Sequence, residues 1–254
     1  MMTVLIPMAG QGKRFEDEGF LKPKPIIEVS EQPMIIQAVN SLPKADSYVF
    51  VCRQDHVDNY QIDKILKSSY PNSHVKAIDY ITEGQASTCL LGEHYIEPES
   101  QLLIAACDNG MRWNADTYNS LISDESIDAI IWAFKNNVTV KRNPHMYGWI
   151  EVDENNRAKR ISCKKPISNN PVEDYAIVAT FWFRRAWEFF SLTKLMIKKD
   201  RRINNEFYVD ELMNEFIEAG LKVKVFEIDK YICWGTPNDL RLYEYWEQFF
   251  KKAY

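Results

Sequence analysis

The chain has 254 residues, of which 46% are hydrophobic and 26% are charged, and its formal net charge is −5. This length is sufficient for one large α/β domain with a sizeable core. The acidic balance argues against a general nucleic-acid-binding protein, which normally carries a broad basic face. Apolar runs stay shorter than the roughly 18 residues of a membrane span, so we expect a protein that binds neither nucleic acid nor membranes.

The cysteines and histidines indicate the compartment and argue against a zinc site. Five cysteines are scattered without a C-x-x-C pair, and four histidines without an H-x-x-x-H pair. Scattered cysteines are typical of reduced thiols in a cytoplasmic protein. The start of the chain also lacks the charged-then-apolar order of a signal peptide. We therefore expect a cytoplasmic protein.

Short apolar segments alternate with amphipathic segments through the first half of the chain. The predicted strands cover residues 4–8, 48–52, 75–81, 102–106 and 127–134. The predicted helices between them cover residues 33–42, 57–68, 85–95 and 114–123. The strands show little alternation, as expected when both faces are buried. The order predicts βαβ units, and hence a mainly parallel sheet with helices on both faces.

The pattern changes after about residue 140. Residues 148–164 predict a hairpin that turns at Asn155-Asn156, and residues 175–183 predict a further strand rich in β-branched and aromatic residues. Helical patterns return at residues 186–199, 209–219 and 237–252. The chain has no internal repeat and no low-complexity linker, so we expect the second half to share the sheet of the first.

The segment that follows the first predicted strand combines flexible backbone with cations. Gly10 and Gly12 let the backbone turn sharply and expose N–H groups to an anion. Lys13 and Arg14 add positive charge, and Arg14 can bind phosphate oxygens through its planar fork. The segment lacks the G-x-x-x-x-G-K-[ST] order of a P-loop. The segment predicts a polyphosphate site. From this segment alone, a surface turn with solvated cations is the alternative.

The longer sequence A-G-x-G-x-R-F, then P-K-P-I-I-E-V, then P-M-I resembles the signature of the nucleotidyltransferases that make nucleotide sugars. Five later segments resemble further motifs of that family in the same order. They are EGQAST (83–88), LLIAACDNG (102–110), KKPIS (164–168), NNEFYVDEL (204–212) and GTPNDL (235–240). The resemblance covers nearly the whole chain and implies a Rossmann-like GT-A nucleotidyltransferase fold.

The resemblance also implies how the chain is divided. It implies a single domain, 1–254, with a nucleotide-binding half at residues 1–135 and an acceptor-binding half at residues 136–254. On the nucleotide side the matching residues are Met8, Ala9, Gly10, Gly12, Lys13, Arg14, Gly84 and Gln85. On the acceptor side they are Lys164, Lys165 and Glu206. Apart from the resemblance, Trp234 beside a motif glycine is a candidate aromatic platform for the acceptor, with a place in the core as the alternative. The catalytic residues implied are Arg14, Lys24, Asp108 and Lys165.

Asp108 matches the family's magnesium-binding aspartate at the end of a buried strand. That is where open α/β sheets place ligand-binding groups, and Mg²⁺ is the cofactor implied. Because Asp108 opens an Asp-Asn-Gly sequence, a helix cap or a turn aspartate stays an alternative.

Two positions depart from the family pattern. Many members carry a second metal-binding aspartate where this chain has Cys233, so Asp108, nucleotide oxygens and water are expected to hold the ion. Asp229 and Asp239 are candidate substitutes, although Asp239 suits a cap of the last helix better. Lys164 stands where the family's E-K-P element has a glutamate that faces sugar hydroxyls. This cation predicts an acceptor with extra negative charge, or one that is not a hexose.

The predicted function is transfer of a nucleoside monophosphate from an NTP (CTP, UTP or GTP) to a phosphorylated small molecule, with release of pyrophosphate. The acceptor expected first is a sugar 1-phosphate for capsule or surface-polysaccharide synthesis. A cytidylyltransferase for a non-sugar phosphate, such as a phosphorylated amine or amide, is the alternative within this class. Two alternatives belong to other classes. One is a GT-A glycosyltransferase, but this chain lacks a D-x-D motif, and that activity leaves the P-K-P cations unexplained. The other is a nucleotide-sensing pseudoenzyme. The sequence does not determine the oligomeric state, and a homo-oligomer is one possibility.

Overall fold

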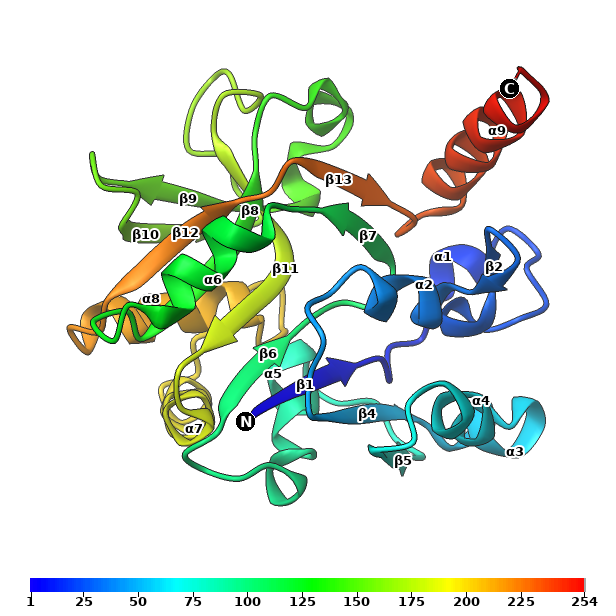
Figure 1. The fold of residues 1–254 in the computed structure, drawn as a ribbon, viewed down its shortest axis with the longest axis horizontal. Helices are drawn as coiled ribbons and strands as arrows, with labels where there is room; N and C mark the ends of the chain where they lie inside the picture. The colour runs from blue at the N-terminus through cyan, green and yellow to red at the C-terminus, as the bar shows by residue number, and fades with distance from the viewer. Residues whose placement is uncertain (254) are drawn as a thin grey trace.

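The computed structural model describes residues 1–253, and a nine-stranded mixed sheet forms its centre (Figure 1). The strands are β1 (Met2–Pro7), β4 (Ser47–Arg53), β5 (Ser73–Ile78), β6 (Gln101–Ile104), β8 (Ala129–Phe134), β9 (Gly148–Val152), β10 (Ala158–Cys163), β11 (Tyr175–Phe183) and β12 (Val223–Glu227). One path runs in the order β10-β9-β11-β6-β1-β4-β5, and β8 joins β11 to β12. Strands from both halves of the chain thus share one sheet.

The sheet is parallel in its N-terminal part and antiparallel around β11. β1 pairs in parallel with β4 and β6, β4 with β5, and β12 with β8. β11 runs antiparallel to its neighbours, and β9 and β10 form the predicted hairpin. The predicted mixed, mainly parallel sheet is confirmed.

Helices cover both faces of the sheet, as predicted. They are α1 (Lys13–Glu16), α2 (Met34–Asn40), α3 (Gln54–Tyr60), α4 (Ile62–Ser69), α5 (Gln85–Leu90), α6 (Ala115–Ser123), α7 (Ala186–Lys198), α8 (Val209–Glu218) and α9 (Pro237–Ala253). Buried residues of α5, α7 and α8 join the core on one face, and those of α2, α4 and α6 join the core on the other. Across residues 1–253, none of the helices combines the length and apolar character needed to cross a membrane.

Short elements that the sequence pattern did not predict complete the fold. They are the strands β2 (Glu28–Val29), β3 (Gln32–Pro33), β7 (Asn109–Arg112) and β13 (Lys230–Cys233), and the 3₁₀ turns η1 (Lys24–Ile26), η2 (Glu93–Tyr95), η3 (Val138–Arg142) and η4 (Pro144–Met146). The predicted helix at 57–68 is wrong as one element, because Gln61 has a left-handed backbone (φ 53°) that separates α3 from α4.

A third, smaller core joins the two ends of the chain. Phe15 of α1 and Met34 of α2 pack with Trp234 and with Leu240 of α9. β7 and β13 form a separate ribbon that leads from the sheet toward α9 (Figure 1). This arrangement brings the segment that follows β13 next to the loop that follows β1.

Candidate active site

The loop after β1 leaves the sheet and opens the short helix α1. Gly12 ends the loop with a left-handed backbone (φ 66°), a conformation that favours glycine. Phe15 is buried and anchors α1, whereas the neighbouring Lys13 and Arg14 are exposed. Neither cation forms an ion pair with another side chain of the described chain. Two charged side chains are therefore free to meet an anion beside the loop.

Lys24 connects the opening segment to the end of β6. Its Nζ donates to the Asp108 carboxylate and to the Gly235 carbonyl, the latter over 3.2 Å. The side chain of Lys24 is 19% exposed and that of Asp108 is 26% exposed. Burial lowers the pKa of Lys24, but the Asp108 charge and hydrogen bond outweigh it and leave that pKa above its ordinary value. Lys24 is thus a protonated cation.

A cavity of about 540 Å³ lies between the glycine loop, Lys24 and the start of α5. Eleven residues that line it were predicted from the sequence: Ala9, Gly10, Gly12, Lys13, Arg14, Lys24, Gly84, Gln85, Asp108, Lys164 and Glu206. Other lining residues carry polar or backbone groups that the sequence did not single out: Gln11, Thr82, Thr88, Tyr208 and Gly235. We call this space the nucleotide cavity. Met8 is buried beside it, and its N–H donates to the Val51 carbonyl over 2.8 Å.

Backbone contacts hold Gly84 against the segment before α8. The Phe207 N–H donates to the Glu83 carbonyl (2.7 Å), and the Ala86 N–H donates to the Phe207 carbonyl (2.9 Å). A Cβ at Gly84 would lie only 2.6 Å from the Phe207 nitrogen, so this contact requires glycine. The contact brings Gln85 and Glu206 to one wall of the nucleotide cavity, although they are far apart in sequence.

A second cavity, of about 260 Å³, adjoins the first. Residues shared by the two cavities form their common wall: Arg14, Gln85, Asp108, Lys164, Tyr208 and Gly235. The second cavity adds Asn109 from β7, Gly148 from β9, Ala179 from β11, Asp210 from α8 and Cys233 from β13. We call it the acceptor cavity. Its residues come from both halves of the chain.

The two lysines of the KKPIS segment point in different directions. Lys164 has a left-handed backbone (φ 61°) directly after β10, and its side chain lines both cavities. Its Nζ donates to the Met146 carbonyl over 2.6 Å and lies 5.0 Å from the centre of the Tyr208 ring. Lys165 is exposed and lines neither cavity. The backbone turn at Lys164 therefore brings in the first lysine and not the second.

Cys233 lies beside Asp108, as its place in the motif predicts. It pairs with Asn109 across the β7–β13 ribbon. A Cβ built on Gly235 would lie 3.2 Å from the Asp108 carboxylate and 3.4 Å from the Cys233 sulfur, so the two groups flank one glycine. Burial, with the charges of Asp108 and Asp239, raises the pKa of Cys233 to about 12. A protonated thiol is a poor ligand for a hard cation.

The residues therefore fit a magnesium ion held by few protein ligands. Within residues 1–253, no three His, Cys, Asp or Glu side chains group to hold a metal. Asp239 accepts a 2.6 Å hydrogen bond from Thr236 at the start of α9, and Asp229 is exposed and lines neither cavity. Asp108 is the acidic residue on the wall that both cavities share. Mg²⁺ commonly keeps several waters and takes one or two carboxylates together with substrate phosphates.

Trp234 lies beneath the site and does not line it. Its side chain is 4% exposed and packs in the third core, 5.7 Å from Tyr243 between ring centres. A Cβ at Gly110 would approach its ring to 2.7 Å. Trp234 lines neither cavity, so the predicted aromatic platform is corrected to a packing residue.

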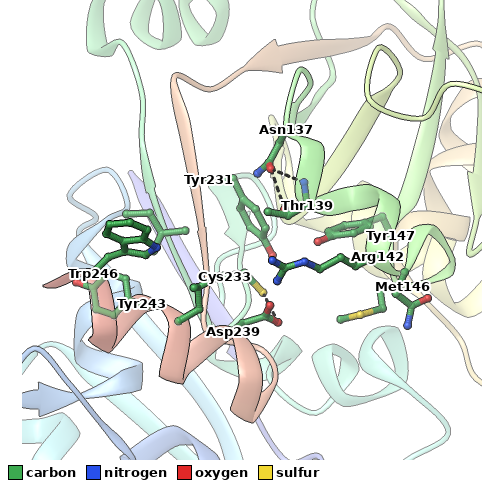
Figure 2. Close-up of a pocket in the computed structure, with 13 residues that line it drawn as sticks. Asn137, Thr139, Arg142, Met146, Tyr147, Tyr231, Cys233, Asp239, Tyr243 and Trp246 are labelled. Atoms are coloured by element: carbon green, nitrogen blue, oxygen red, sulfur yellow. Dashed lines mark hydrogen bonds between the residues drawn. The ribbon is translucent and has the colours of Figure 1, made fainter. Parts of the chain in front are cut away.

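A third cavity, of about 250 Å³, lies between α9 and residues 137–147 (Figure 2). Met146, Tyr147, Tyr231 and Cys233 line both this cavity and the acceptor cavity. In Figure 2 the Arg142 side chain extends toward Tyr231, opposite Cys233 and Asp239. This outer cavity extends the acceptor side toward α9.

Comparisons with known proteins establish the fold. Neither a protein-family model nor a curated protein sequence matches the chain. Among solved structures, a nucleoside-diphosphate-sugar pyrophosphorylase from Vibrio cholerae superposes with a TM-score of 0.78 at 18% identity, covering 94% of this chain and 98% of its own. An inositol-1-phosphate CTP transferase from T. maritima gives 0.74 at 18% identity, covering 96% and 93%. An apo UDP-glucose pyrophosphorylase gives 0.74 at 16% identity, covering both chains completely. The chain therefore has the α/β fold of these nucleotidyltransferase structures.

Proposed function

We propose that the protein transfers a nucleoside monophosphate from an NTP to a phosphorylated small molecule and releases pyrophosphate. One observation carries the proposal. The glycine loop, four cations (Lys13, Arg14, Lys24 and Lys164) and Asp108 surround a single cavity, in a fold whose solved examples are named for this kind of transfer. A glycosyltransferase would leave the cations of the opening segment without a role.

The reaction brings two anions together, because a phosphate oxygen of the acceptor attacks the α-phosphorus of the nucleotide. Exposed Lys13 and Arg14 would bind the triphosphate together with N–H groups of the glycine loop. Lys24 and Lys164 also line this cavity, where positive charge would offset repulsion as the partners approach. Catalysis would consist of in-line alignment and charge stabilisation. No covalent protein nucleophile is required.

Asp108 would hold a magnesium ion, which when bound neutralises charge on the phosphate oxygens. Lys24, already hydrogen-bonded to this carboxylate, would keep Asp108 oriented toward the cavities. Cys233 beside it would stay protonated, so it would leave the remaining positions of the ion to nucleotide oxygens and water.

Gly84 and Gln85 would contact the nucleobase of CTP, UTP or GTP. Both line the nucleotide cavity next to the glycine loop. The acceptor proposed first is a sugar 1-phosphate for surface-polysaccharide synthesis. Cytidylyl transfer to a non-sugar phosphate is the second candidate, and it is favoured by Lys164, which lies in the acceptor cavity where related sequences carry a glutamate.

A matrix of nucleotides and acceptors tests the proposal. CTP, UTP, GTP and ATP are each combined with sugar 1-phosphates, phosphoethanolamine, phosphocholine and glycerol 3-phosphate, with Mg²⁺, and pyrophosphate is measured. We expect release that depends on both substrates for at least one pair. Nucleotide binding without acceptor-dependent pyrophosphate release across the matrix would instead indicate a nucleotide sensor.

A further inference from the structure

Asp210 is a buried carboxylate that faces the acceptor cavity. It is the second residue of α8, is 7% exposed, and lines the cavity across from Lys164. Its carboxylate makes no side-chain hydrogen bond or ion pair with another residue in the described part of the chain. Its own backbone N–H hydrogen-bonds the carboxylate. A buried carboxylate without a side-chain partner is costly, so its remaining acceptor positions call for a group that is not part of the protein.

The Asp210 carboxylate lies against the start of β9. A Cβ built on Gly148 would lie 2.2 Å from the Asp210 Oδ2 atom and 2.9 Å from the Ile177 Cδ1 atom. Gly148 opens β9, and the absence of a side chain there lets the Asp210 carboxylate lie directly against the strand. Glycine at position 148 therefore leaves the space that the Asp210 carboxylate occupies.

Another buried acid on the same helix shows what a structural carboxylate looks like in this protein. Glu215 of α8 is 1% exposed, and its carboxylate lies 2.6 Å from Lys199 and 3.0 Å from Arg201. Asp210 is buried to a similar degree without such a partner. Burial raises the pKa of Asp210, even though the charge of Lys164 acts in the opposite direction. The two acids differ in that Glu215 faces basic side chains of the protein, whereas Asp210 faces the acceptor cavity.

We propose that Asp210 is a specificity-determining residue whose carboxylate accepts a hydrogen bond from an N–H or O–H group that the acceptor carries in addition to its phosphate. The inference rests on the proposed function, since it takes this cavity as the acceptor site. Lys164 on one wall would meet the phosphate, and Asp210 on another would meet the donor. An acceptor that lacks a donor would leave a buried carboxylate unpaired and would be used poorly.

The experiment compares Asp210→Asn with Glu215→Gln, which makes the same chemical change at the paired acid. Kinetics use two matched pairs of acceptors. Phosphoethanolamine and phosphocholine differ in the N–H donor, and glucose 1-phosphate and cyclohexyl phosphate differ in the O–H donors. We expect the wild type to prefer the donor-bearing member of one pair by about 10-fold or more in kcat/KM, on the scale of one charged hydrogen bond. The pair that shows this preference identifies the donor.

Asp210→Asn should remove that preference while the KM for the nucleotide stays unchanged, and Glu215→Gln should keep it. Thermal unfolding gives a second readout that does not depend on catalysis. Asp210→Asn should keep or raise the Tm, because it removes a buried charge without breaking an ion pair, whereas Glu215→Gln should lower it.

Two results would overturn the assignment. One is an acceptor preference that Asp210→Asn leaves intact. The other is a loss of Tm in Asp210→Asn as large as that in Glu215→Gln, which would show that the carboxylate serves the start of α8 instead. If the wild type releases no pyrophosphate with any substrate pair, the proposed function fails, and the Tm comparison still decides whether Asp210 is an unpaired carboxylate.

Discussion

The nucleotide and acceptor cavities share a wall, yet the chain builds them in different ways. The nucleotide cavity takes most of its charge from one segment, residues 9–24, which follows the first strand and uses backbone as well as side chains. The acceptor cavity takes one or a few residues from each of β7, β9, β11, α8 and β13. A contiguous anion site leaves a strong sequence pattern, whereas a site assembled from distant segments does not.

The two cavities also differ in charge. Cations dominate the nucleotide cavity, as a triphosphate requires. The acceptor cavity places Lys164 opposite a buried carboxylate, Asp210. The first arrangement suits any polyphosphate, and the second discriminates among small molecules. Variants of the shared wall should therefore affect every substrate, and variants of the acceptor cavity should affect only some.

The largest expected effect is at Asp108, on the shared wall. Asp108→Ala should lower kcat/KM by about 10³-fold or more for all substrates, because it removes the proposed magnesium ligand and the partner of Lys24. Steady-state pyrophosphate release measures the effect, and circular dichroism verifies the fold. Near-normal turnover in a folded variant would remove Asp108 from the mechanism.

The next effect is at the cations of the opening segment. Arg14→Ala and Lys24→Ala should each lower kcat by about 10²-fold, as expected when a preorganised charge stabiliser is lost. Lys22→Ala is the matched control, because Lys22 is 53% exposed and pairs with Glu28 outside the nucleotide cavity. A rise in KM with unchanged kcat would mean that Arg14 and Lys24 bind ground state and transition state equally.

The sequence predicted the sheet and the glycine loop because the alternation of strands with helices and the loop itself are local patterns. The family resemblance supplied the other predicted residues of the nucleotide cavity. It did not predict Asp210 as a site residue, since only the contact of α8 with Gly148 brings that carboxylate to the cavity. An aromatic ring beside a motif glycine suggested Trp234 for the site, but tertiary packing buries that ring in the third core. Lys164 was predicted through a motif, while the left-handed turn that directs it inward cannot be read from its neighbours.

A smaller effect should separate the two lysines of the KKPIS segment. Lys164→Ala should lower kcat/KM for the acceptor by about 10-fold or more, since its ammonium lines the cavity. Lys165→Ala should change it by less than about 2-fold, as expected for an exposed cation. Acceptor titrations at saturating nucleotide measure both. A larger loss of kcat/KM in Lys165→Ala than in Lys164→Ala would show that Lys165 turns inward when substrate is bound.

The last prediction concerns the chemical reactivity of Cys233 and not the rate of turnover. Its pKa of about 12 lies above the ordinary value of 9.0, so the thiolate forms only as the pH rises toward 12. At pH 8 the folded protein should hold about 10³-fold less thiolate than an ordinary cysteine, and iodoacetamide should react slowly. Mass spectrometry of alkylated peptides measures the rate, with the urea-unfolded protein as control. Rapid modification of Cys233 in the folded protein would show an ionised sulfur beside Asp108.

Phosphorus NMR of one complete reaction tests the central claim most directly. The protein is mixed with Mg²⁺, the preferred NTP and the preferred acceptor, and the spectrum is followed over time. We expect the β and γ signals of the NTP to be replaced by pyrophosphate, while two new coupled signals show the acceptor phosphorus joined to the nucleotide α-phosphorus. Consumption of NTP to free phosphate, or an unchanged spectrum with nucleotide bound, would contradict nucleotidyl transfer.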